Sequence, residues 1–154
     1  MTLALDIDAI KHALGRWEED PLASGLHARR LSLAVASEQL SAGFDLVIGQ
    51  YLARTQFIED LERVAERHGA RFCEFVLDLD AVALAERLVV RGANPDRPEH
   101  EVNNRLVGPD DANALVDSVE PLRQSRPRAE WVDARGPLSS TLGILRAALD
   151  APTY

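Results

Sequence analysis

The feature that most constrains the fold is an alternation of short apolar runs with longer stretches whose apolar residues recur every three or four positions. Apolar runs occupy residues 3–5, 44–49, 71–78 and 129–134. Helical periodicity covers residues 7–14, 25–42, 55–69, 81–92, 110–123 and 139–150. Alternating strands and helices predict parallel strands with right-handed crossovers. We therefore expect an α/β fold of three layers, with one parallel sheet covered by helices on both faces.

Two polar stretches interrupt this alternation. Residues 16–25 ("RWEEDPLASG") contain a proline and a glycine and are expected to form a loop. Residues 93–110 contain further prolines, and we expect a long, lid-like connection at about 92–109. A length of 154 residues is enough for one domain with its own core, so we expect a single domain over 1–154.

Charge and composition exclude several classes of protein. The net charge of −8 argues against a broad surface for nucleic acid or anionic membranes. No apolar run approaches the ~20 residues of a membrane span. Cys73 is the single cysteine, so an internal disulfide is impossible and we expect a protein of the reducing cytoplasm.

Charged side chains follow each predicted strand, at the point where it ends. Because the carboxyl ends of parallel strands meet at one edge, where ligands bind in such sheets, we expect these side chains to share a site. Arginines hold phosphate oxygens, and carboxylates hold magnesium or accept a hydroxyl proton. The mixture suits a phosphorylated ligand with a metal ion. The candidates, in chain order, are Asp6, Asp8, Tyr51, Arg54, Asp78, Asp80, Arg87, Arg91, Asp133, Arg135 and Gly136.

Structural roles remain open for several of these candidates. Asp8 and Asp80 each precede or begin a helix and could cap it. Arg87 and Arg91 are four residues apart and could form a solvated helix face, and Arg54 could be a surface residue at a helix start. The histidines lack the spacing of a metal site, and no motif for a dinucleotide or a serine nucleophile is present. We therefore predict no metal ligands by residue.

Four stretches together resemble the P-loop kinases of small molecules, the group that includes chloramphenicol phosphotransferase-like and zeta-toxin-like enzymes. "LALDIDAIKHALG" resembles the second strand of these kinases with its carboxylate, and "FDLVIGQYLARTQFIEDLERVAERHG" resembles their third strand and following helix. "FVLDLDAVALAERLVVRG" resembles the fourth strand and the arginine-bearing helix that leads to the lid. "WVDARGPLSSTLGILRAAL" resembles the fifth strand and closing helix. The resemblance covers nearly the whole chain in the family's order.

The resemblance implies a transfer of the γ-phosphoryl group of ATP to a small-molecule hydroxyl, with Mg²⁺ as cofactor. Asp8 would accept the hydroxyl proton, with Asp6 as an alternative or a partner on the magnesium side. The resemblance places Tyr51 and Arg54 on the substrate side. Arg87 and Arg91 would be lid arginines that steady the transferring phosphate. The segment from Asp133 through Arg135 to Gly136 would lie near the adenine.

One departure from the family is large. These kinases begin with a strand and the loop G-x-x-x-x-G-K-[ST], and neither the glycine pattern nor a lysine other than Lys11 occurs here. The resemblance thus implies a P-loop NTPase-like sheet whose first, central strand is absent, and a chain impaired in catalysis. A late start codon, a degenerate relative and a half completed by another polypeptide all remain open as explanations. The alternative is a non-catalytic α/β binding or regulatory module.

The missing strand would have a structural consequence. In the family's sheet the first strand lies between the third and the fourth, so the strands at 44–49 and 71–78 would flank a vacant position. Two strands on either side of a vacant strand position lie about 10 Å apart. They cannot form backbone hydrogen bonds with each other, because bonded neighbours lie about 4.8 Å apart. We expect either that these two strands pair directly or that their edges are covered by another copy of the chain or by a partner.

Overall fold

The computed structural model describes residues 1–95 and 98–151. The chain divides into two compact units, which we call unit 1 (Met1–Phe72) and unit 2 (Cys73–Tyr154). The candidate lid-like segment at 92–109 includes residues 96 and 97, which lie outside the described residues. Across the part that the structure describes, no helix combines the length and the apolar character needed to span a bilayer.

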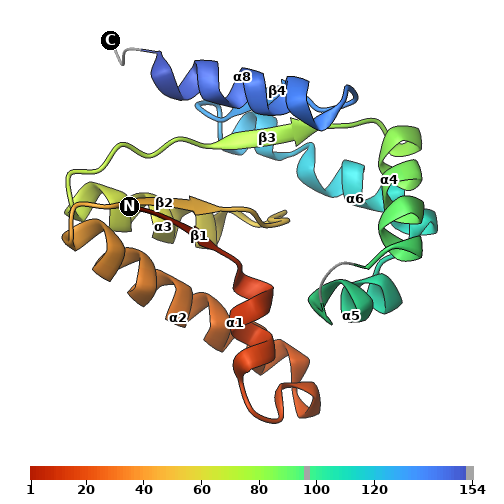
Figure 1. The fold of residues 1–154 in the computed structure, drawn as a ribbon, viewed down its shortest axis with the longest axis horizontal. Helices are drawn as coiled ribbons and strands as arrows, with labels where there is room; N and C mark the ends of the chain where they lie inside the picture. Colours follow the sequence, from red (N-terminus) through yellow and green to blue (C-terminus); the bar gives the residue numbers. More distant parts are fainter. Residues whose placement is uncertain (96–97, 152–154) are drawn as a thin grey trace. The chain divides into compact units, whose positions relative to one another are not determined.

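Unit 1 consists of a parallel strand pair and helices. Its strands are short, and its longest element is α2, the orange helix of Figure 1. In chain order the elements are β1 (Thr2–Leu5), α1 (Ile7–Ala13), a 3-10 turn (Trp17–Glu19), α2 (Pro21–Ser41), β2 (Asp45–Ile48) and α3 (Thr55–Arg67).

Capping aspartates, a proline and a glycine set the ends of the first two helices of unit 1. The Asp6 carboxylate accepts hydrogen bonds from the backbone N–H groups of Asp8 (2.9 Å) and Ala9 (3.3 Å), so Asp6 caps α1. Asp20 caps α2 and Pro21 occupies its first position, so the helix includes part of the stretch at 16–25, which was expected to be a loop. Gly43 follows α2 at φ +77°, a conformation that glycine adopts without strain.

The core of unit 1 forms between its helices and one face of its strand pair. Ile7, Ala28 and Phe57 are buried together, and Ile48 of β2 packs against them. Strands β1 and β2 run parallel with Ala4 opposite Val47. Alternate residues point to opposite faces of a strand, so Ile48 faces the core while Val47 stays 56% exposed.

A glutamine joins the two strands of unit 1 to α2. The Gln39 side-chain N–H₂ donates to the backbone carbonyl of Met1 (3.3 Å) and to that of Asp45 (3.0 Å). These carbonyls stand at the starts of β1 and β2. One α2 side chain therefore helps to hold the register of the pair.

Unit 2 contains the second parallel strand pair. Its buried side chains include Leu88, Ala112, Leu122 and Val132. Its elements are β3 (Phe75–Asp78), α4 (Ala81–Ala93), α5 (Pro98–Leu106), a 3-10 turn (Pro109–Asp111), α6 (Ala112–Val119), α7 (Leu122–Ser125), β4 (Glu130–Asp133) and α8 (Leu138–Asp150). Helix α5 lies in the stretch that was expected to be a connection.

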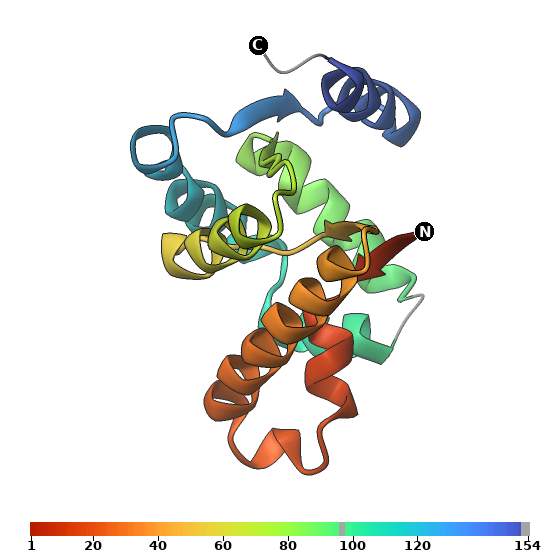
Figure 2. The same cartoon turned by 90° about the vertical axis from the view of Figure 1, so that its left-hand side faces the viewer.

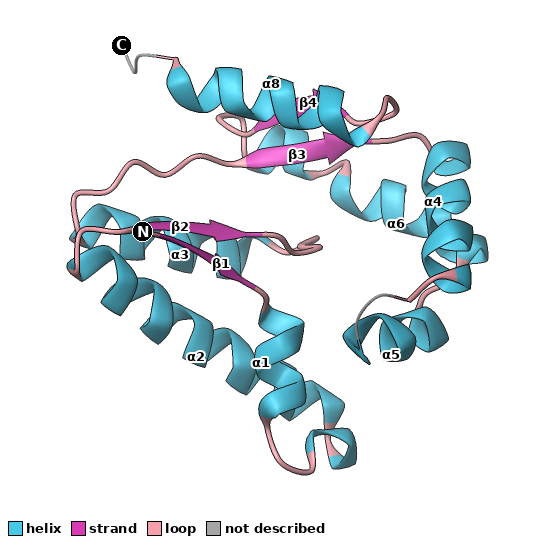
Figure 3. Cartoon of the chain, in the orientation of Figure 1, coloured by secondary structure: helices cyan, strands magenta, loops and turns pink. Residues whose placement is uncertain are grey.

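The expectation of a single three-layer sheet is wrong. Over residues 1–95 and 98–151 the chain is helix-rich (62% helical), and the strands there form two two-stranded parallel sheets, β1–β2 and β3–β4 (Figure 3). Strands share a sheet only where their backbones bond directly, about 4.8 Å apart. Within the described residues β2 bonds to β1 alone and β3 to β4 alone, so the first of the two expected outcomes, direct pairing of β2 with β3, does not occur. The second outcome, coverage of the strand edges by another chain, stays a prediction. Figure 2 shows the same elements from a second direction.

Candidate functional site

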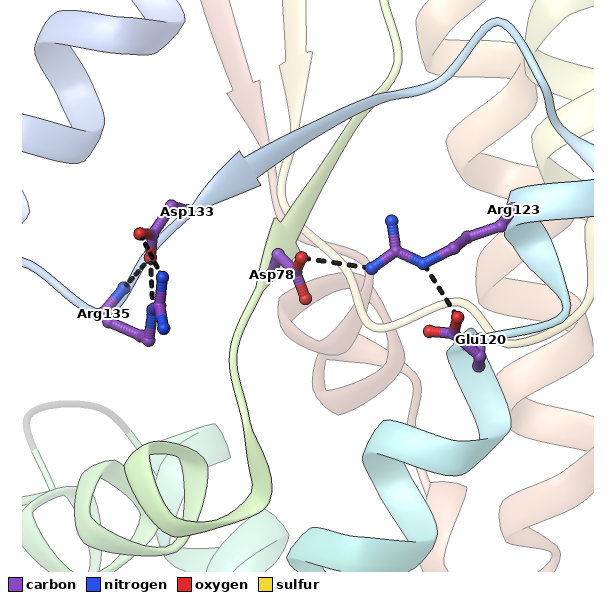
Figure 4. A network of polar contacts seen from close by, with 5 residues as sticks. All are labelled: Asp78, Glu120, Arg123, Asp133 and Arg135. Carbon is purple, nitrogen blue, oxygen red and sulfur yellow. Dashed lines mark hydrogen bonds and ion pairs between the residues drawn. The ribbon is translucent and has the colours of Figure 1, made fainter.

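The candidate site lies in unit 2, at the carboxyl ends of β3 and β4. The parallel register pairs Leu77 with Val132 and Asp78 with Asp133. The last residue of each strand is thus an aspartate, and the two stand side by side at the same end of the pair. Figure 4 shows both with the arginines that contact them. The sequence predicted both Asp78 and Asp133 at such an edge, and the pairing of β3 with β4 makes them direct neighbours.

Asp133 is held by Arg135, two residues further along the chain. The Asp133 carboxylate accepts hydrogen bonds from the backbone N–H of Arg135 (3.0 Å) and from its side-chain Nε (2.9 Å) and Nη2 (2.7 Å). These bonds, first from the side chain and then from the backbone, hold the pKa of Asp133 well below its ordinary value. The same hydrogen bonding to Asp133 raises the pKa of Arg135. Both side chains are more than half exposed.

Asp78 is held by an arginine from a different helix. Nη2 of Arg123, in α7, lies 3.1 Å from the Asp78 carboxylate, and its Nε lies 2.8 Å from the Glu120 carboxylate. The same guanidinium lies over the ring of Trp131, 3.5 Å from the ring centre. A cation over an aromatic face is attracted by the ring electrons. Arg123 therefore ties α7 to both strands of the pair.

Arg87 contacts the loop that follows β4. Its Nη2 donates a hydrogen bond to the backbone carbonyl of Ala134 and lies 3.3 Å from the carbonyl oxygen of Gly136. The structure thus brings Arg87 into contact with the segment from Asp133 to Gly136. The resemblance implied different roles for the two, the transferring phosphate for Arg87 and the adenine for the segment. In this arrangement the guanidinium of Arg87 serves to hold the loop in place.

Arg91 joins α4 to α5. Its Nε donates to the Asn104 side-chain carbonyl (2.8 Å), and the Asn104 amide donates back to the Arg91 backbone carbonyl (3.3 Å). The two arginines predicted to steady a phosphate are therefore one turn apart on α4 and occupied with different partners. Asp80, before them, caps α4 by accepting a bond from the Ala83 N–H (2.8 Å), which confirms the capping interpretation.

The remaining predicted site residues lie in unit 1. Asp6 is the cap of α1, and Asp8 lies in the first turn of that helix. Arg54 is the residue before α3 and makes no side-chain cap bond there, and Tyr51 is half exposed. Unit 1 therefore contains the predicted proton acceptor and substrate-side residues, whereas unit 2 contains the predicted phosphate and adenine side.

Sequence reasoning missed Arg123, Glu120 and Trp131 as parts of this network. Arg123 and Asp78 are separated by 45 residues in the chain, and no spacing rule connects such positions. A weak signal was present, since a basic residue near a helix end preceded a strand containing a tryptophan. Only the pairing of β3 with β4 brings the three side chains to one place.

The residues of this site do not fit a protein-held metal ion or a complete ATP site. Among the described residues no group of three or more histidines, cysteines or carboxylates is placed to hold a metal. Asp78 and Asp133 both use their carboxylates to bind arginine. No glycine-rich loop or lysine stands at this edge to hold a triphosphate. Neither Mg²⁺ nor ATP is therefore assigned to this edge.

Asp133→Asn is expected to cause a small loss of resistance of unit 2 to urea at neutral pH, because water screens the exposed Asp133–Arg135 pair, and to have still less effect in acid. The folded-state pKa of Asp133 is depressed, so its stabilising effect is present above the ordinary carboxyl pKa of 3.8 and is lost as the pH falls toward the folded-state value. Urea titrations between about pH 7 and about pH 3 would test this. Asp117→Asn, on α6, is the control. A difference between wild type and Asp133→Asn that grows in acid would contradict the assignment.

The chain was compared with protein families, curated proteins and solved structures. No family model, no curated protein and no solved structure matches this chain.

Proposed function

We propose that this chain is a module that binds a phosphorylated, hydroxyl-bearing small molecule at the carboxyl edge of β3 and β4, and that it does not itself transfer a phosphoryl group. The observation that carries the proposal is the side-by-side placement of Asp78 and Asp133, each held by an arginine. Ligands of parallel sheets bind beyond the carboxyl ends of the strands.

The exposed Arg135–Asp133 pair supports an exchange of partners on binding. Both side chains are more than half exposed, so water screens the pair and its contribution to stability is small. An incoming phosphate can take the two-pronged guanidinium contact that the carboxylate now occupies. The released Asp133 carboxylate, next to Asp78, then accepts hydrogen bonds from ligand hydroxyl groups. A ligand with both groups uses both halves of the site.

Two features of the chain disfavour phosphoryl transfer, namely the partners of its arginines and the missing phosphate loop. Arg87 is engaged with backbone carbonyls and Arg91 with Asn104, so neither is presented to a ligand. The sequence lacks the G-x-x-x-x-G-K-[ST] loop that would hold a triphosphate. Descent from small-molecule kinases remains our proposal for the origin of the chain, supported by its strand and helix order and by the carboxylates after the strands.

An ATP-dependent small-molecule phosphotransferase is the second candidate. It is favoured by Asp8 in the first turn of α1, directly after a strand, where the resemblance implies the proton acceptor. In that case ATP, Mg²⁺ and a small-molecule acceptor would all bind.

The net charge of −8 supports neither nucleic acid nor an anionic membrane as partner, and the single Cys73 supports a cytoplasmic location.

Calorimetry with ribose 5-phosphate, inorganic phosphate, ribose and MgATP tests the proposal. We expect ribose 5-phosphate to bind with a dissociation constant on the order of millimolar, more tightly than phosphate or ribose alone. Arg135→Ala should abolish this binding, while Arg146→Ala, which removes an exposed arginine of α8, should leave it unchanged. MgATP should bind no more tightly than ribose 5-phosphate.

Two results would count against the module. Lack of any ribose 5-phosphate binding at concentrations well above millimolar would remove the proposed ligand class. Micromolar affinity for MgATP, or release of phosphate from ATP by the chain, would favour the phosphotransferase instead.

A further inference from the structure

The free edge of β2 is an unprotected strand edge. Strand β2 bonds to β1 along one side, and within residues 1–95 and 98–151 no strand bonds to its other side. Soluble proteins usually protect such edges with lysine, proline or a bulge, because unpaired backbone N–H and C=O groups recruit further strands. The sequence of β2, "DLVI", contains no lysine or proline, and its one charged residue, Asp45, stands at the start of the strand. Val47 in its middle is 56% exposed.

We propose that the edge of β2 pairs with β2 of a second copy of this chain, antiparallel and about a two-fold axis. In an antiparallel strand pair, two residues that lie opposite each other point to the same face of the sheet, and a two-fold axis makes the pairing identical for both copies. With Val47 opposite Val47 of the second copy, Leu46 lies opposite Ile48 and Asp45 opposite Gly49. The result is a four-stranded sheet in the order β1–β2–β2–β1. Mixed parallel and antiparallel sheets of this kind are common.

Charge selects β2 rather than β3 for this contact. Strand β2 has one acidic residue, Asp45, and the antiparallel arrangement places the two copies of Asp45 at opposite ends of the pair. Strand β3 also has a free edge, but it is bracketed by Glu74 and Asp78. A two-fold arrangement centred on Val76 would place Glu74 opposite Asp78 of the other copy, and one centred on Leu77, the position equivalent to Val47, would place Glu74 opposite Asp80. Like charges directly opposite each other destabilise a strand pair.

Side-chain preference selects β2 rather than β1. The free edge of β1, "TLAL", would bring Ala4 opposite Ala4. Valine and isoleucine favour strands more than alanine and leucine do, and a valine pair buries more apolar surface than an alanine pair. Edges of four residues bury less than the ~1,200 Å² of a standard interface. We therefore expect a weak, reversible dimer.

Sedimentation equilibrium over a range of concentrations tests the dimer. The weight-average mass of the wild type should rise from one copy toward two, and Val47→Lys should remain at one copy. Leu77→Lys is the matched control, because Leu77 is the third residue of β3, as Val47 is of β2, and is 52% exposed. It should behave as wild type. Circular dichroism confirms that both variants are folded.

Cross-linking tests the register. In a Cys73→Ala background, Val47→Cys should form a covalent dimer with a short thiol-to-thiol reagent, because directly opposed residues have Cβ atoms about 4.5–5.5 Å apart. Leu77→Cys should remain largely uncross-linked. A wild type that is monomeric at all concentrations, equal loss of the dimer in Val47→Lys and Leu77→Lys, or equal cross-linking at the two positions would overturn the proposal.

Discussion

Arg126→Ala is expected to lower the free energy of unfolding of unit 2 by about 3–5 kcal/mol, among the largest effects of any single change in this chain. Arg126 and Glu74 form an ion pair of 2.8 Å whose side chains are only 11% and 12% exposed. Arg126 also donates from Nε to the same Glu74 oxygen at 2.9 Å. Removing the guanidinium leaves a carboxylate in a site that water scarcely reaches. A carboxylate without its partner in such a place costs far more than the pair itself contributes.

Glu74 has no second hydrogen bond among the described side chains that could replace the lost contact with Arg126. Its other carboxylate oxygen, Oε1, is buried and has no hydrogen-bond partner among the residues that the structure describes. Glu74 also stands directly before β3, and its backbone carbonyl accepts a bond from the Glu130 N–H (2.9 Å). A displaced Glu74 would therefore disturb the start of the β3–β4 pair. Loss of stability and loss of the strand pairing should appear together.

Urea unfolding with hydrogen exchange of the β3 and β4 peptides measures this effect. Arg128→Ala is the control, since Arg128 lies two residues further along the same segment but is exposed, and surface changes usually stay within about 0.5 kcal/mol. The double change Glu74→Leu with Arg126→Leu should recover much of the loss, because it removes the charge together with its partner. An Arg126→Ala effect no larger than that of Arg128→Ala would show that the pair is solvated.

Phe57→Ala is expected to destabilise unit 1 by about 3–5 kcal/mol. The Phe57 side chain is 5% exposed and forms the buried cluster with Ile7 and Ala28. It is the largest side chain in that cluster, and its removal leaves a cavity between α1, α2 and α3. The guanidinium of Arg29 lies 5.8 Å from the ring centre and would lose this contact as well.

Hydrogen exchange of α1 and α3, together with urea unfolding, measures this loss. Leu22→Ala is the control, because Leu22 lies in α2 but is 75% exposed. Its truncation should change the free energy of unfolding by about 0.5 kcal/mol or less. A Phe57→Ala protein with exchange as slow as wild type would mean that the cluster is not the core of unit 1.

Local sequence determined most of the helices and strands. Phe57, Ile58, Val64 and Ala65 of α3 are buried at the three- and four-residue spacing that predicts a helix over 55–69. Gly69, at φ +64°, follows the end of this helix. Asp80 caps α4 for the same local reason. These features depend on residues within one or two turns of each other, so their physics is readable from the chain alone. The proline and glycine at 16–25 predict a loop, whereas in the structure Asp20 caps α2 and Pro21 is its first residue.

Strand partnership was decided only by the tertiary structure. The apolar runs predicted the strands, but a free edge and a bonded edge carry the same side chains, and nothing in "DLVI" or "FVLD" states how many neighbours each has. The same holds for the candidate site. Asp78, Arg123 and Trp131 meet only because β3 pairs with β4 and α7 packs beside them. Periodicity encodes which face of an element is buried, whereas backbone hydrogen bonds between distant segments depend on contacts that no local pattern specifies.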